Sequence, residues 1–254
     1  MKKKLPAAAM AVLLLLSAAG CGAPKGEAGP VKIATKPMTE QYILGEMLGL
    51  LIEDAGYTVE ITKGIGGGTS NIQPAMEKGE FDLYPEYTST GYVMVLDHDA
   101  AGVTDDEIWE ALQTEYHDKY RMAWVGQYGF NLLCETYGMD FKDVRDIDIG
   151  LKYAALASGD IDVTNAFTTD AQLAVADVVT LEDDLRLQVN YFCATVVRED
   201  ALEKYPGLED ALKKMEGILT DQEMAALNYQ VEVEERGERD VARAFLASKG
   251  LLEG

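Results

Sequence analysis

Hydrophobic and polar residues after position 30 follow strand and helix periods in turn. The predicted elements are, in order, a strand at 31–34, a helix at 39–54, a strand at 58–61, a helix at 69–78 and a strand at 81–84. Gly56 and Gly79 follow the two helices, as is typical of helix C-termini. Strands and helices that alternate with such short connections predict an α/β fold whose sheet is mainly parallel and has helices on both faces. Ligands of such sheets bind beyond the carboxyl ends of the strands.

The later part of the chain has less regular patterns. The predicted elements are a helix capped by Thr104, a strand at 121–125, a helix at 151–158, strands at 161–165, 177–180 and 189–197, and a helical tail from Asp200 interrupted at Gly207, Thr220 and Gly237. We interpret Gly129 to Asn131 as the crossing into a second lobe and 189–197 as the returning strand. The first lobe then comprises 31–128 plus 192–254, and its helical tail packs against the rest of that lobe. The second lobe comprises 129–191.

An internal similarity at an offset of 80 residues supports two lobes that are built alike. Residues 79–89 align without gaps on residues 159–169, and both segments place an Asp inside a predicted strand and an aromatic-Thr pair just past its end. Tyr87 and Phe167 are the two aromatic residues, so two such rims that face each other would form a cleft. The alternative is chance similarity, because a Gly followed by acidic residues is an ordinary helix-to-strand turn.

The first 30 residues have a different character. Lysines at 2–4 precede an apolar run at 5–19, which is shorter than the ~20 residues of a membrane span and is typical of a secretory signal. Small residues directly precede Cys21, so we expect 1–20 to be a signal peptide, Cys21 to be lipidated, and 21–30 to be a flexible tether. The protein would then lie outside the cytoplasm, attached to the membrane by its lipid alone. The alternative is an ordinary cleaved signal with an incidental cysteine.

Charge and missing motifs exclude several function classes. The formal net charge of −22 makes nucleic acid and anionic lipid poor partners. The two histidines do not stand at metal-ligand spacing, and the chain has neither a nucleophile motif nor a phosphate or dinucleotide fingerprint. We therefore expect no enzyme, no metal and no cofactor.

Tyrosine is the candidate chemistry that the chain does offer. Several of its 13 tyrosines lie near predicted strand ends, among them Tyr84, Tyr87 and Tyr191. A quaternary ammonium has no N–H to donate and is bound by aromatic faces, each worth about 0.5–2 kcal/mol. For any single tyrosine the alternative is a half-buried ring whose hydroxyl is in water.

Two cysteines remain beyond position 21, Cys134 and Cys193. We favour two small buried residues that lie apart, because two cysteines do not make a disulfide framework. The alternative is a disulfide between the two predicted crossing strands.

Several motifs resemble the substrate-binding proteins of glycine betaine/carnitine/choline ABC importers. They are Thr39 to Leu48 (TEQYILGEML), Gly66 to Thr69 (GGGT), Asp82 to Gly91 (DLYPEYTSTG), Gly129 to Asn131, Val196 to Asp200 and Leu227 to Val231. The resemblance covers nearly all of 31–254. It implies a two-lobed type II periplasmic-binding fold that closes on its ligand, and as partners a small quaternary amine and an ABC permease with its ATPase subunit. The protein itself would be a monomer.

The resemblance also implies a binding site. The positions that match the family's aromatic cage are Tyr87, Tyr191 and Phe167, where the family usually has Tyr, and Thr39, Gln41, Gly68 and Thr69 would line the first-lobe wall. We add Tyr84 as a candidate because of its place near a strand end. The second lobe is shorter than in the family: a cage tyrosine falls on Cys134 or is lost, and the arginine that can bind a betaine carboxylate has no counterpart. This departure favours choline over glycine betaine, and it leaves open a lipoprotein that acts as an interaction or regulatory partner without delivering a solute.

Overall fold

The computed structural model describes residues 29–100, 102–128, 147, 151–181 and 192–252. The first lobe contains β1 (Val31–Ala34), α1 (Thr39–Asp54), β2 (Val59–Thr62), α2 (Thr69–Glu77), β3 (Leu83–Tyr87), α3 (Thr88–Thr90), the π-helical turn η1 (Gly91–Val95), α4 (Asp105–Tyr120), β4 (Met122–Tyr128), β5 (Cys193–Arg198), α6 (Glu199–Lys204), α7 (Leu208–Lys213), α8 (Asp221–Glu232) and α9 (Glu238–Ser248). Two elements, α5 (Lys152–Ser158) and the 3-10 turn η2 (Ala171–Ala174), fall within 129–191, the range predicted as the second lobe, and the names first lobe and second lobe are kept below for the predicted ranges. No helix in these ranges is both long enough and apolar enough to cross a membrane.

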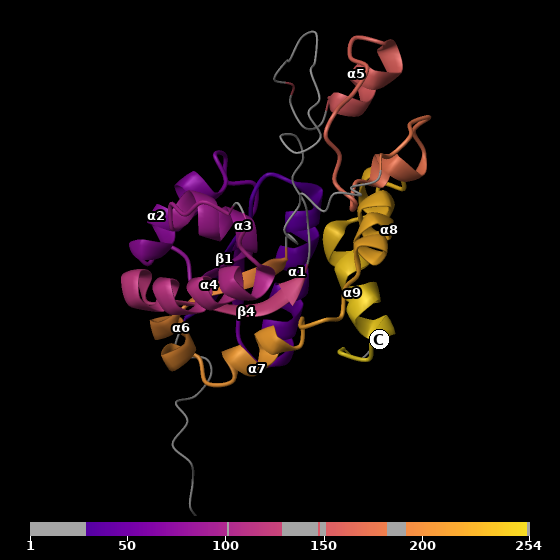
Figure 1. Ribbon diagram of the computed structural model, residues 1–254. Coiled ribbons are helices and arrows are strands. Elements are labelled where there is room, and N and C mark those ends of the chain that lie inside the picture. The colour runs from indigo at the N-terminus through magenta and orange to yellow at the C-terminus, as the bar shows by residue number, and fades with distance from the viewer. Residues whose placement is uncertain (1–28, 101, 129–146, 148–150, 182–191, 253–254) are drawn as a thin grey trace, which may run out of the picture.

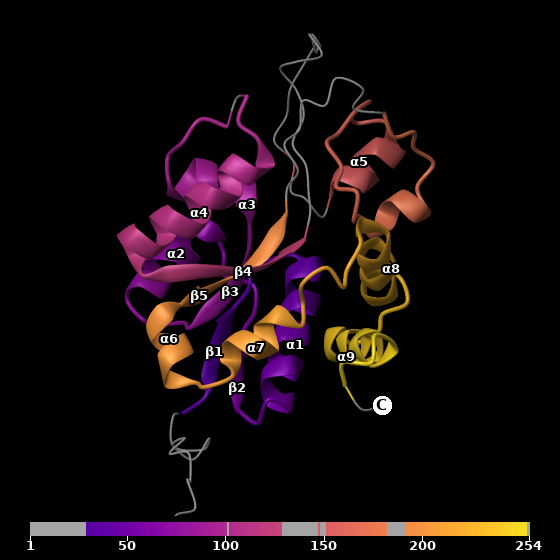
Figure 2. The ribbon, with the colours of Figure 1, turned by 60° about the horizontal axis from the view of Figure 1, so that its bottom comes forward.

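The strands of the first lobe form one sheet in the order β2-β1-β3-β5-β4 (Figure 2). β1 runs parallel to β2 and β3, whereas β5 runs antiparallel to both of its neighbours. The α/β class is therefore confirmed, but the sheet is mixed where we expected a mainly parallel one. The reason is β5 alone: it follows the second lobe in the chain and enters the sheet in the reverse direction, between β3 and β4.

Helices cover both faces of the sheet, and each face has its own hydrophobic core (Figures 1 and 2). One core lies under α1, α7, α8 and α9, and the other under α2 and α4. Gly45 permits the close fit of α1, since a Cβ there would lie 2.6 Å from Thr35 Cγ2. The alternation of side chains along β3 assigns Leu83 and Tyr87 to the first core and Tyr84 to the second.

The sequence predicted most ends of these helices correctly. Thr104 and Thr220 accept hydrogen bonds from the backbone N–H of the residue three positions on, and both form complete capping boxes. The helical tail is interrupted at Gly207, Thr220 and Gly237, and it packs against α1 as expected. Helix α2 begins at Thr69 after Gly68 at its N-cap position, and the Thr69 hydroxyl donates to Glu86 Oε2 at 2.6 Å.

The second lobe differs from its prediction. The helix at 151–158 forms, but residues 161–165 and 177–180 are not strands. A strand needs a hydrogen-bonded neighbour and a core for one face, and here Val163 is 55% exposed and Val179 88% exposed. The two similar segments, 79–89 and 159–169, therefore each follow a helix that ends at a Gly, but only the first segment contains a strand.

Several predictions concern residues outside those that the structure describes. They are the signal peptide at 1–20, the tether at 21–30 apart from its last two residues, the crossing at 129–131, Cys134 and Tyr191. Cys193 is described and is buried at the start of β5, opposite Tyr87 in the sheet.

Candidate functional site

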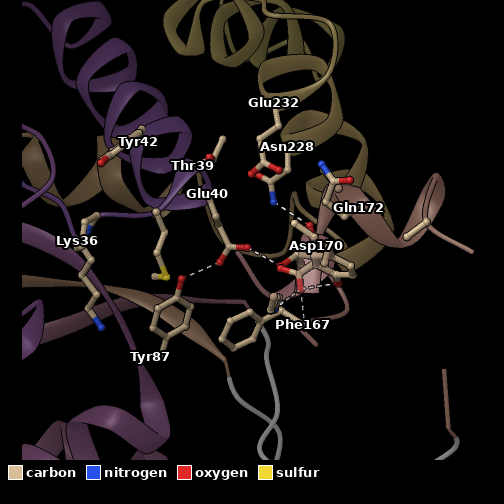
Figure 3. Close-up of a pocket in the computed structure, with 18 of the residues that line it drawn as sticks. Lys36, Thr39, Glu40, Tyr42, Tyr87, Phe167, Asp170, Gln172, Asn228 and Glu232 are labelled. Atoms are coloured by element: carbon tan, nitrogen blue, oxygen red, sulfur yellow. Dashed lines mark hydrogen bonds and ion pairs between the residues drawn. The ribbon is translucent and has the colours of Figure 1, made fainter. Parts of the chain in front are cut away.

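A cavity of about 1010 Å³ lies between the two lobes, beyond the carboxyl ends of β1 and β3 (Figure 3). The first lobe contributes the turn after β1, the start of α1, the start of α2 and the end of β3. The second lobe contributes α5 and the segment from Phe167 to Ala176, and α8 closes one side. The polar and aromatic lining residues are Lys36, Thr39, Glu40, Tyr42, Thr69, Tyr87, Thr90, Lys152, Tyr153, Phe167, Thr169, Asp170, Gln172, Asn228 and Glu232.

Tyr87 is the aromatic ring of the first-lobe wall. It ends β3, is only 7% exposed, and its hydroxyl donates to Glu40 Oε1 at 2.7 Å. Burial, and next the Glu40 charge, raise the pKa of Tyr87 well above its usual value, so the hydroxyl stays protonated. The Lys36 ammonium lies 4.7 Å from the centre of the ring and is paired with the buried carboxylate of Glu86. The ring thus already carries a cation on one side.

The second lobe presents a similar arrangement around Phe167. The Lys152 ammonium lies 4.8 Å from the centre of the Phe167 ring and 5.2 Å from that of Tyr153. It pairs with Asp170 Oδ2 at 2.6 Å, and the same oxygen accepts from the Tyr153 hydroxyl at 2.7 Å and from the Phe167 N–H at 3.0 Å. Burial, and next the hydrogen bond to Asp170, raise the pKa of the Tyr153 hydroxyl. Asp170 therefore fixes both rings.

Glu40 connects the two lobes. One carboxylate oxygen accepts from the Tyr87 hydroxyl, and the other accepts from the Thr169 hydroxyl at 2.6 Å (Figure 3). Glu40 is half-buried, and its pKa is raised, chiefly by burial, although both hydrogen bonds oppose the shift. The start of α1 thus places a carboxylate in the cleft between the rings.

Helix α8 holds the second-lobe segment in place. The side-chain N–H of Asn228 donates to the backbone carbonyl of Thr169 at 2.8 Å, and the Thr168 hydroxyl donates to Asp221 at 2.8 Å. Asn228 is 4% exposed and belongs to the LNYQV motif at 227–231. The loop that carries Phe167 is therefore fixed by a helix of the first lobe.

The structure brings some of the predicted site residues together and separates others. Thr39, Thr69, Tyr87 and Phe167 line the cavity, and Gly67 does so in place of the predicted Gly68. Gln41 and Tyr84 are fully buried and do not line it.

Helical and strand periods explain both exceptions. Gln41 points about 100° away from Glu40 around α1, and its side chain accepts a hydrogen bond from the Lys36 N–H at 3.3 Å. Tyr84 lies on the opposite face of β3 from Tyr87, and its hydroxyl donates to Gln73 at 3.1 Å.

Sequence reasoning missed Glu40, Lys152, Tyr153 and Asp170. Glu40 had a signal, since it stands between two predicted wall residues in the TEQ motif. Asp170 had a weaker one, as the acidic residue that follows the Phe-Thr-Thr segment. Lys152 and Tyr153 had none, because only the fold brings the start of α5 to the cavity.

Comparison with known proteins places the chain in a family. The model of the substrate binding domain of ABC-type glycine betaine transport systems matches residues 29–133 and 131–248. The ergothioneine transport permease/ergothioneine binding protein EgtU of Helicobacter pylori is 33% identical over 291 residues, covering 96% of this chain and 52% of that protein. The chain thus spans about half the length of that relative.

Two further proteins match over nearly their whole length. The carnitine transport binding protein OpuCC of Listeria monocytogenes is 26% identical, with 100% of this chain and 99% of that protein covered. The crystal structure of a glycine betaine/carnitine/choline ABC transporter protein has the same fold, with a TM-score of 0.72 and 23% identity over 87% of this chain and 99% of that one. The periplasmic-binding fold is thereby confirmed, and the chain belongs to the family of substrate-binding domains of ABC-type glycine betaine transport systems.

Proposed function

We propose that this chain captures a quaternary-ammonium solute in the cavity between its lobes and delivers it to an ABC permease with its ATPase subunit. The observation that carries the proposal is that Tyr87 of one lobe and Phe167 of the other line the same cavity. Aromatic faces bind a cation that cannot donate hydrogen bonds. The cavity is large enough for a small solute with room to close around it.

The lysines in the cavity support the cage. Each ring has an ammonium within 5 Å of its centre, so the environment of both rings tolerates a positive charge. A solute that enters between Tyr87 and Phe167 would use the ring surface that the lysines leave open. We place Tyr191, which lies outside the described residues, in the cage on the strength of the family resemblance alone.

The polar lining favours choline over glycine betaine. Among the lining residues that the structure describes, the cationic side chains are Lys36 and Lys152, and both are paired with carboxylates of the protein. A ligand carboxylate therefore meets no unpaired cation there. Asn228 Oδ1 is buried and accepts no hydrogen bond from the described residues, so it offers an acceptor for the hydroxyl of choline or carnitine. Ergothioneine joins the candidates because the Helicobacter pylori relative is named for it.

The second lobe, 129–191, is proposed to be shorter than in relatives. The alignments run over 291 and 311 residues against the 254 of this chain, so the relatives contain segments that it lacks. The two matches to the family model meet at 131–133, where we place the crossing into this lobe. A shorter lobe leaves fewer side chains to surround the ligand, and the rings near α5 gain importance.

We further propose that Cys21 is lipidated and holds a monomeric binding protein at the outer side of the membrane. Cys21→Ala is expected to release the protein from the membrane fraction. A Cys21→Ala protein that stays bound to the membrane would contradict the anchor.

The test is calorimetric titration of residues 22–254 with choline, carnitine, glycine betaine and ergothioneine. Tyr87→Leu removes a cage ring and is expected to weaken binding about three- to thirty-fold. Tyr84→Phe is the matched control, because it changes a tyrosine of the same strand that faces the other core. Absence of heat with all four solutes would favour the interaction or regulatory role over solute delivery.

A further inference from the structure

Among the lining carboxylates that the structure describes, Glu40 is the half-buried one that no lysine neutralises. Lys36 pairs with Glu86, and Lys152 pairs with Asp170. Glu40 lies between these pairs, and within the described part of the chain its side chain accepts hydrogen bonds from two hydroxyl groups, those of Tyr87 and Thr169. Asp221 and Asp170 lie close enough to act on its charge and add to the negative potential. Glu40 and Glu232 are thus the lining carboxylates that no cation of the described residues neutralises, and of the two Glu232 is exposed at the end of α8.

The geometry of Glu40 suits a cation that has no N–H. Each carboxylate oxygen already accepts one hydroxyl, which holds the group in place between the lobes. The two hydroxyls use about half of the lone-pair sites of the carboxylate, so fewer remain for an ammonium with N–H groups. A quaternary ammonium needs only the charge, so it can approach while both hydrogen bonds persist.

The position of Glu40 also matches that of the rings. Its carboxylate touches the hydroxyl of Tyr87, and Thr169 stands two residues after Phe167. A cation held between these rings is therefore close to the carboxylate as well. Because Glu40 is half-buried, the attraction is screened less than at a solvent-exposed site.

We propose that Glu40 is the anionic partner of the bound quaternary ammonium and the residue that selects a cation over a neutral solute of the same shape. The inference rests on the proposed function and deepens it. The aromatic rings alone would also accept a neutral apolar group by burial of its surface. The charge of Glu40 adds a term that only a cation receives.

The test compares Glu40→Gln with the wild type in calorimetric titrations. The probes are choline, carnitine, glycine betaine, ergothioneine and the neutral tert-butyl isostere of choline, in which carbon replaces the quaternary nitrogen. Glu53→Gln is the matched control, since it makes the same change on the same helix about 20 Å away, at an exposed position. Glu40→Gln is expected to lower the affinity for each quaternary amine that the wild type binds by roughly ten- to hundred-fold. Glu53→Gln should leave these affinities unchanged.

The isostere separates recognition of charge from damage to the cavity. Its affinity is expected to be the same for the wild type and for Glu40→Gln. The inference is wrong, while the proposed function stands, if Glu40→Gln binds the amines as tightly as the wild type does. It is also wrong if the substitution lowers the affinity for the isostere as much as the affinity for the amines. If the wild type binds none of the four amines, both are wrong.

Discussion

The two lobes support the candidate site in different ways. Tyr87 ends a strand at the centre of a sheet with hydrophobic cores on both faces, and its position follows from the packing of the first lobe. Phe167 is on a segment without strands, where Val163, Val179 and Leu181 are largely exposed. Its position depends on packing of its side chain against the edge of the first core, on hydrogen bonds to Asp170 and on the contact of Asn228 with Thr169.

This difference suits the proposed capture of a solute between the lobes. Apolar packing over a broad area fixes one wall of the cavity, whereas the packing of Phe167 and a few polar contacts fix the other. Elements that move in binding come from the less stable part of a structure, where buried apolar contacts are few. We therefore expect the first lobe to determine stability and the second lobe to adjust to the ligand, and four measurements test this division.

The largest effect is expected in the first lobe. Leu48 is fully buried in α1, so Leu48→Ala should lower the free energy of unfolding by about 2–5 kcal/mol. Val163→Ala, at a 55% exposed position of the second lobe, should change it by less than about 0.5 kcal/mol. Denaturant unfolding measures both. Equal losses would mean that the second lobe has a core of its own.

A smaller effect is expected at the contact between the lobes. Asn228→Ala leaves the Thr169 carbonyl without its donor, which should cost about 1–3 kcal/mol locally. Hydrogen exchange of the amides at 167–170 should accelerate, and solute affinity should fall. Gln222→Ala, on the exposed side of the same helix, is the control. Unchanged exchange in Asn228→Ala would show that other contacts hold the segment.

The next effect concerns binding alone. Phe167→Leu removes a ring but keeps an apolar side chain, and it should weaken solute affinity about two- to thirty-fold with little change in unfolding. Val179→Ala, 88% exposed in the same lobe, should change neither quantity. Calorimetry and thermal unfolding distinguish the two. A large loss of stability in Phe167→Leu would indicate a structural role instead.

The smallest effect is a pH dependence at Glu40. Burial raises the pKa of Glu40 above its usual value of 4.5, so the folded state binds the proton more tightly than the unfolded state. The wild type therefore loses stability relative to Glu40→Gln as the pH rises from 4.5 through the raised pKa. Denaturant unfolding of both proteins at several pH values measures the difference. A constant difference across that range would contradict the raised pKa.

The elements of the first lobe were predictable because their signals are local. Helical spacing marks α1, a Thr with Glu three residues later marks the starts of α4 and α8, and glycines mark the helix ends. The direction of β5 and the absence of strands at 161–165 and 177–180 were not predictable. Both depend on which segments find a partner in the folded chain, and an alternating pattern does not contain that information.

The sequence by itself determined the α/β class, the family and two residues that line opposite walls of the cavity, Tyr87 and Phe167. Motifs and side-chain periods are properties of neighbouring residues, so they can be found without coordinates. Only the tertiary structure brought Glu40 to Thr169, 129 residues further along, and Lys152 onto the ring of Phe167. The charge balance of the cavity was decided there, because it depends on distances between side chains that different elements supply.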